Sequence, residues 1–168
     1  WAYYNGAVPN DQSIGIAANF REIDPAIDDA IFNGMLGIRC WRGLYPADGD
    51  PTFGDLPAEG QEMFYEAHEQ LDNAMWHAWA RQLREYIEQQ PTVCDSAADA
   101  NWAFLQVAGP ILDPEAAARD GATGATLAAL WANDAPSIAE LQEGVTILDT
   151  LFPCPQCESC PVPQEWGY

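Results

Sequence analysis

The sequence contains no lysine and little positive charge of any kind. Its six basic residues are all arginines, and they stand against 26 acidic residues, so the formal net charge is −20 at pH 7. Binding to DNA or RNA needs cationic side chains that displace counterions from phosphates. An anionic membrane surface would repel the same acidic chain. We therefore expect neither a nucleic acid nor an anionic membrane as a partner.

Long apolar runs and catalytic signatures are missing as well. No run approaches the roughly 20 apolar residues of a membrane-spanning helix, so no membrane insertion is expected. The sequence has no Gly-rich phosphate-binding loop ending in Lys-Ser or Lys-Thr, and without lysine there is no Schiff-base chemistry. None of its four serines lies in a Gly-x-Ser-x-Gly turn. These absences predict a protein that is not an enzyme.

What the sequence does contain is enough apolar material for a core. Of 168 residues, 48% are hydrophobic, including seven Trp, six Tyr and six Phe, which suits one folded domain. The acidic surplus has two interpretations. Adaptation to salty surroundings, where screening relieves self-repulsion, is favoured over a cationic partner or bound divalent metal. The chain begins at Trp1 without methionine, from which we expect that a segment was removed; a signal peptide would place the protein outside the cytoplasm.

The residue pattern predicts a mainly α, compact helical domain with at most a small β element. An irregular arm (1–22), a helical core (23–152) and an irregular tail rich in Pro and Cys (153–168) make up this single domain. Apolar residues recur at helical spacing over 58–89, which predicts the longest helix, ending before Pro91.

Shorter helices are expected on both sides of it. Asp24-Pro25 predicts a helix start and Gly34 its end, with an extended segment at 35–45. Further predictions are a helix from Cys94-Asp95-Ser96 to Gly109-Pro110, an Ala-rich turn from Asp113, a helix at 123–133, and one from Pro136-Ser137 to near Gly144. Residues 145–152 fit a strand or a helix equally well.

A run of three cysteines near the C-terminus, Cys154, Cys157 and Cys160, is the most specific motif. Thiolates at this spacing can converge on one metal ion, with Cys40 or Cys94 supplying a distant fourth ligand. The Cys-Pro-x-Cys half resembles one knuckle of a zinc ribbon or rubredoxin-type site, and the run resembles the start of a bacterial ferredoxin motif. Zn or an Fe–S cluster is therefore one prediction. Disulfides are the favoured alternative, with a bridge from the tail to Cys40 or Cys94 stabilising an irregular segment, and free thiols are the third.

Oxygen-bearing residues in the loop 48–59 follow part of the spacing of an EF-hand calcium loop. Asp48, Asp50, Thr52 and Glu59 occupy its first, third, fifth and twelfth positions. The sixth position is Phe53, where that loop needs glycine, so an acidic turn-rich loop is the favoured interpretation over a Ca²⁺ site.

Polar residues on the 58–89 helix offer weaker candidates. Its glutamates at 59, 62, 66 and 69 share one helix face, which is interpreted as a solvated face rather than a metal or cationic-partner site. His68 and His77 are too far around the helix from each other to bind one metal, and each is expected to be an ordinary surface or core histidine.

Aromatic residues gather at both ends of the chain: Trp1, Tyr3, Tyr4, Trp166 and Tyr168. Termini fray unless they are anchored, so these side chains predict contact with the protein's own core or with a neighbouring subunit. The favoured function is a non-enzymatic structural or assembly subunit of a homo- or hetero-oligomeric complex, virion or extracellular, without a cofactor. A metal-binding or redox module using the three-cysteine run is the alternative, and a small secreted enzyme or accessory subunit is a third option.

Overall fold

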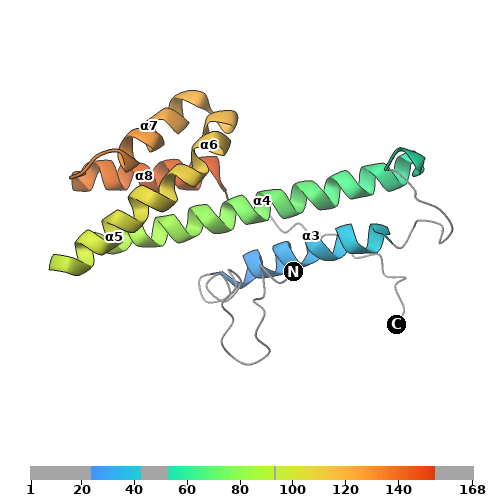
Figure 1. Cartoon of the computed structure of the whole chain (residues 1–168), viewed down its shortest axis with the longest axis horizontal. Helices are drawn as coiled ribbons and strands as arrows, with labels where there is room; N and C mark the ends of the chain where they lie inside the picture. Colours follow the sequence, from blue (N-terminus) through green and yellow to red (C-terminus); the bar gives the residue numbers. More distant parts are fainter. Residues whose placement is uncertain (1–23, 43–52, 93, 154–168) are drawn as a thin grey trace. The chain divides into compact units, whose positions relative to one another are not determined.

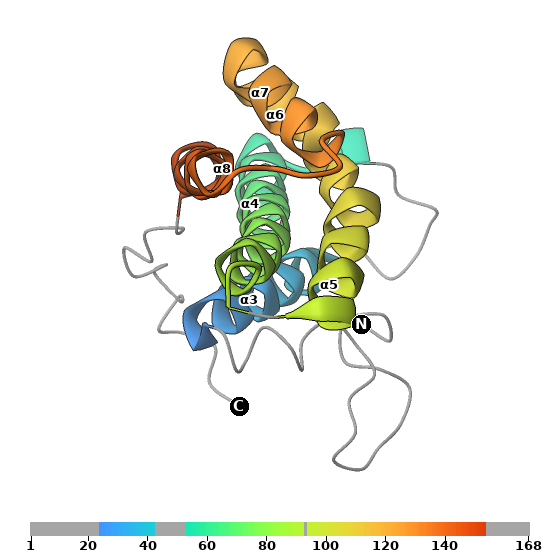
Figure 2. The same cartoon turned by 90° about the vertical axis from the view of Figure 1, so that its left-hand side faces the viewer.

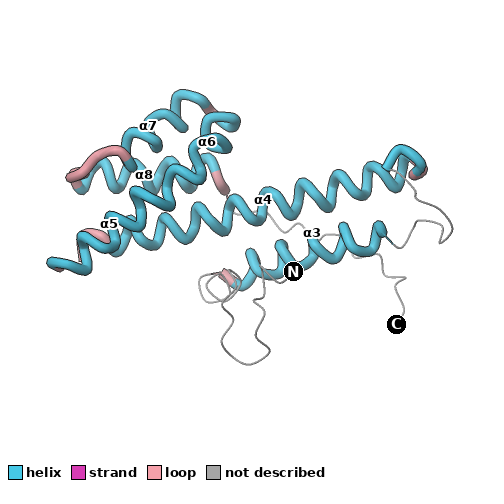
Figure 3. The backbone as a smooth tube through the Cα atoms, in the orientation of Figure 1, coloured by secondary structure: helices cyan, strands magenta, loops and turns pink. Residues whose placement is uncertain are grey.

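The computed structural model describes residues 24–42, 53–92 and 94–153 of the chain. Within them 86% of residues are helical and no strand occurs, which confirms the mainly α prediction (Figure 3). The elements, in order, are α3 (Pro25–Arg42), η1 (Phe53–Asp55), α4 (Ala58–Gln89), α5 (Asp95–Ala108), η2 (Gly109–Leu112), α6 (Asp113–Arg119), α7 (Gly121–Trp131) and α8 (Ile138–Leu151), as Figure 1 shows. The predicted arm at 1–22 and almost all of the predicted tail lie outside the described residues.

Contacts gather the chain into two units that divide within α4. Among the described residues, the first unit comprises those up to Ala74 and the second comprises those from Met75 onward. The helix itself runs without a break from Ala58 to Gln89, as its apolar spacing predicts. That the chain forms a single domain stays a prediction.

In the first unit, α3 lies antiparallel to the first half of α4. Its start follows the predicted signal, because the Ala26 N–H donates to Asp24 Oδ1 at 3.0 Å. The helix then passes straight through Gly34 to Arg42, so the predicted stop at Gly34 and the extended segment from 35 are wrong. The reason is packing: a Cβ on Gly34 would lie 2.8 Å from the Leu71 Cβ, so this glycine allows two helices to approach closely.

The helices of the second unit (Figure 2) share an apolar core, to which each contributes at least one buried residue, from α6 only Ala116. Its largest fully buried side chains are Leu83, Ile87, Leu105, Leu112, Leu127, Leu148 and Phe152. Two indoles pack in this core and bond at its edge: Trp79 Nε1 donates to the Ala108 carbonyl at 3.2 Å, and Trp102 Nε1 donates to the Asn133 carbonyl at 3.0 Å. An indole suits such a place because it is large and apolar with one donor to satisfy.

Helix α8 begins with a capping box and continues past its glycine. The Glu140 N–H donates to Ser137 Oγ at 3.3 Å, while the Ser137 N–H donates to Glu140 Oε2 at 2.7 Å. The predicted stop near Gly144 is wrong, since the helix reaches Leu151 and residues 145–151 are helical. Gly144 again marks close packing, because a Cβ there would lie 2.4 Å from Leu130 Cδ2.

The C-terminal end of α8 is held by two side chains from other helices. His77 Nδ1 donates to the Phe152 carbonyl at 2.6 Å, and this assigns the hydrogen to Nδ1 because a carbonyl can only accept. Arg119 Nη1 donates to the Leu151 carbonyl at 2.8 Å, and its guanidinium lies 4.7 Å from the centre of the Phe152 ring. Both bonds satisfy carbonyls that the helix leaves without partners.

Candidate functional site

Most of the cysteine and aromatic candidates fall outside the described residues. These are Cys154, Cys157, Cys160, Trp1, Tyr3, Tyr4, Trp166 and Tyr168. The backbone of Cys40 belongs to α3, and Cys94 is an exposed free thiol at the start of α5. Whether the three-cysteine run binds metal or forms disulfides therefore stays a prediction.

The calcium-loop candidates are only partly described. Asp48, Asp50 and Thr52 lie outside, whereas Glu59 is exposed in the first turn of α4. The other glutamates of its face, at 62, 66 and 69, are exposed too. The part of the chain that the structure describes holds no group of three or more His, Cys, Asp or Glu placed to bind a metal ion. The glutamate face is exposed in the described structure, and its interpretation as a solvated face rather than a metal or cationic-partner site stays a prediction.

The two histidines occupy the ordinary positions expected of them. His68 is exposed, with its ring 6.0 Å from that of Phe64. His77 is 8% exposed and is held by its bond to the Phe152 carbonyl.

A surface that the sequence reasoning missed lies along α5 and η2. Val107 is 79% exposed and Ile111 is 50% exposed, and Ala103 and Pro110 beside them are also exposed. We call these four residues the α5 ridge. No charged residue occurs from 100 to 112, between Asp99 and Asp113, in a chain with 26 acidic residues. That gap in the charge pattern was the signal that could have revealed the surface.

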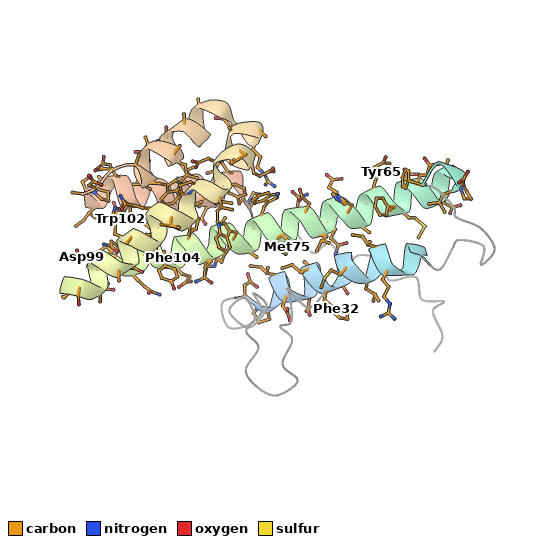
Figure 4. All side chains as sticks on the ribbon, viewed as in Figure 1. Phe32, Tyr65, Met75, Asp99, Trp102 and Phe104 are labelled. Carbon is orange, nitrogen blue, oxygen red and sulfur yellow. The ribbon has the colours of Figure 1, made fainter. Side chains whose placement is uncertain are left out.

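The opposite sides of α5 are occupied by the core. Trp102 reaches toward the end of α7 through its bond to Asn133, and the Phe104 ring lies 4.4 Å from that of Tyr86 on α4 (Figure 4). Asn101 is buried and donates to the Tyr86 carbonyl at 2.9 Å. Apolar side chains therefore lie on the inner faces of α5 and again on the α5 ridge, and only the inner faces are covered within the second unit.

A shallow groove of about 130 Å³ runs between α7 and α8. Its floor is apolar and consists of Leu130, Gly144 and Ile147, all buried. Its rim is formed by Thr126, Ala129, Glu140 and Glu143, all exposed. Bonds from Ser137 and Asn133 to Glu140 lower the pKa of that carboxyl, so it is ionised at neutral pH.

One buried polar contact in the second unit is incomplete. Asp113 Oδ1 and Trp131 Nε1 are both buried without a hydrogen bond of ordinary geometry among the described residues. Burial raises the pKa of the Asp113 carboxyl, and the indole N–H of Trp131 opposes that rise. The indole also lies against Gly109, where a Cβ would come within 2.4 Å of its ring.

Neither protein families, nor curated proteins, nor solved structures gave a match to this chain. None of the described helices is both long enough and apolar enough to cross a bilayer.

Proposed function

We propose that the protein is a non-enzymatic structural subunit whose copies join through the α5 ridge. The observation that supports this is the uncharged, apolar outer face of residues 103–111, with Val107 79% exposed and Ile111 50% exposed. Exposed apolar patches of this kind commonly mark protein interfaces.

The charge distribution favours a second copy as the occupant. Two chains of net charge −20 repel each other wherever their carboxylates meet. The α5 ridge itself carries no carboxylate, the nearest on the same helix face being the exposed Asp99 one turn before Ala103, so it is the part of this face on which two copies repel least. Closed symmetric pairing of one patch with itself is also the commonest form of oligomer.

An extracellular or virion setting remains part of the proposal on composition alone. Salt at high concentration would screen the acidic surface and allow copies to associate. The proposal requires no cofactor, since none of the residues that carry it is a metal ligand or a nucleophile.

Sedimentation velocity over a range of protein and NaCl concentrations tests the proposed contact. The wild-type chain should self-associate, more tightly at about 1 M NaCl than at low salt. Replacing Val107 and Ile111 together by serine should weaken association at least about tenfold, because burying each such side chain contributes roughly 1.5–3 kcal/mol.

The matched control is Ile138→Ser, which removes another exposed isoleucine of the second unit, 62% exposed and outside the α5 ridge. It should associate like the wild type. A wild-type chain that stays monomeric at high protein and salt concentration would refute the proposal, as would equal weakening by the control.

A further inference from the structure

We infer that the α7–α8 groove receives the side chain of an arginine or lysine presented by a second, cationic protein of the same assembly. This rests on the proposed function in that it places the chain in a complex, but the groove and the α5 ridge share no residue. The partner is defined by its chemistry: an aliphatic stem that ends in a positively charged donor.

The size of the groove selects the class of ligand. At about 130 Å³ it is well below the roughly 300–1,000 Å³ of pockets for cofactors and drug-sized ligands. One extended side chain suits such a space. Its floor of Leu130, Gly144 and Ile147 offers apolar contact for methylene groups, which arginine and lysine side chains make while their charged ends stay in water.

The rim selects the charge. Its polar groups are the carboxylates of Glu140 and Glu143 and the hydroxyl of Thr126. That hydroxyl donates its hydrogen to the Ala122 carbonyl at 3.3 Å, so only its lone pairs are left for a ligand. The rim therefore consists of acceptors and carries no free donor. Guanidinium and ammonium groups are the side-chain ends that donate and never accept.

The two carboxylates differ in a useful way. Glu140 is held in one position by the Ser137 N–H at 2.7 Å and by Asn133 Nδ2 at 3.2 Å. Glu143, one turn along α8, forms no ion pair or hydrogen bond with the described residues and is free to turn toward a ligand. One fixed and one adaptable acceptor can bind a cationic end with little loss of conformational entropy.

The second unit cannot fill the groove from its own cations. The chain has no lysine, and the arginines of this unit are engaged elsewhere. Arg81 pairs with Glu85, Arg84 pairs with Glu88 and Asp149, and Arg119 pairs with Glu115. The cation must come from outside this unit.

Two-dimensional ¹H–¹⁵N NMR of the full chain tests the inference with N-acetyl-arginine amide as the probe. Its isostere N-acetyl-citrulline amide, which lacks the charge, is the ligand control. We expect millimolar binding of the arginine probe, with shifts concentrated on the amides of Ala129, Glu143 and Gly144, and at least about fivefold weaker binding of citrulline.

Three variants complete the test. Glu143→Gln should weaken the arginine probe about fivefold, and Ala129→Leu should remove binding by filling the groove from an exposed position. Asp99→Asn deletes one negative charge from α5 and should leave binding unchanged. Equal binding of citrulline, shifts spread over all acidic surfaces, or equal loss in Asp99→Asn would overturn the inference. These outcomes do not depend on self-association through the α5 ridge, so the two proposals fail separately.

Discussion

The two halves of α4 belong to one continuous helix but pack in opposite ways. In the first unit, the helix contacts α3 through small residues: beside Gly34 and Leu71, a Cβ on Gly37 would lie 2.9 Å from the Ala67 Cβ. In the second unit, Leu83 and Ile87 insert fully buried side chains into a large apolar core. At Gly34 and Gly37 the first contact depends on the absence of side-chain atoms, although Ile27 and Ile31 of α3 are fully buried, whereas the second depends on large side chains throughout.

The halves also differ in charge pairing. Arg81 and Arg84 in the second half form i,i+4 pairs with Glu85 and Glu88. The first half has no basic residue from 58 to 74, and its glutamate face makes no ion pair with any described residue. We therefore expect the second unit to be sensitive to loss of core volume, and the first to added volume and to salt.

The largest effect should come from removing volume in the second unit. Leu83→Ala should lower the free energy of unfolding by about 2–5 kcal/mol, because Leu83 is fully buried and its loss leaves a cavity. Urea unfolding followed by circular dichroism measures the change. Met63→Ala, at a position 44% exposed on the first half of α4, should cost far less. Equal costs at both positions would contradict the comparison.

Adding volume should be costly in the first unit. Gly34→Leu should destabilise the protein by about 1–3 kcal/mol, since the contacting atoms include the Leu71 backbone and cannot move aside like a side-chain end. Gly121→Ala is the control, because a Cβ there meets nothing within 4 Å. It should be neutral or stabilise slightly. A tolerated Gly34→Leu would mean that α3 does not lie this close to α4.

Helix starts could be predicted from the sequence, whereas two helix ends could not. Helix starts were predictable from local chemistry, as at Asp24-Pro25 and Ser137, because capping involves neighbouring residues. The longest helix was predictable from its apolar spacing. In the sequence alone, Gly34 and Gly144 indicate helix ends, because glycine often ends helices. Their actual role depends on Leu71 and Leu130, which are remote in sequence.

The candidate sites were predictable to a smaller extent. The sequence draws attention to residue types with recognised chemistry, such as the three-cysteine run and Glu59. The α7–α8 groove instead combines ordinary residues of two helices, and only their packing places Leu130 beside Gly144. The α5 ridge left a trace in the uncharged stretch 100–112, but exposure of Val107 depends on how α5 packs.

A smaller effect should separate the two kinds of arginine in the second unit. Arg119→Gln should cost about 1–2 kcal/mol, because it removes the bond to the Leu151 carbonyl, the pairing with Glu115 and the contact with the Phe152 ring. Arg81→Gln removes one partly exposed i,i+4 pair and should cost only about 0.3–0.5 kcal/mol. Thermal unfolding of both variants measures the difference, and equal costs would show that α8 is not held by Arg119.

Salt should act mainly on the first half of α4. Neighbouring glutamates at 59, 62, 66 and 69 repel by about 0.2–0.5 kcal/mol per pair, or about 1 kcal/mol in all. About 1 M NaCl shortens the screening length to about 3 Å and should relieve this repulsion. On adding NaCl, amide hydrogen exchange should slow more in residues 58–74 than in residues 75–89. Glu66→Gln should reduce the salt-induced slowing in 58–74. Equal slowing in both halves would contradict the proposed difference in their ion pairing. Sulfate salts must be avoided in this test because they strengthen apolar burial.

The smallest effect compares one carboxyl from each unit. Burial raises the pKa of both Asp28 and Asp113; the neighbouring charge of Asp29 adds to the rise at Asp28, while the Trp131 indole opposes it at Asp113. A pKa above the unfolded value means that the native state holds the proton more tightly. Each group therefore favours folding below its unfolded pKa, and this contribution is lost as pH rises through the folded pKa.

Carboxyl NMR titration should show that Asp29→Asn lowers the pKa of Asp28 and leaves the pKa of Asp113 unchanged. NaCl should likewise lower the pKa of Asp28 in part, because it screens Asp29, but should have little effect on Asp113, whose pKa is raised by burial. Equal responses of the two carboxyls to salt would remove this last difference between the units.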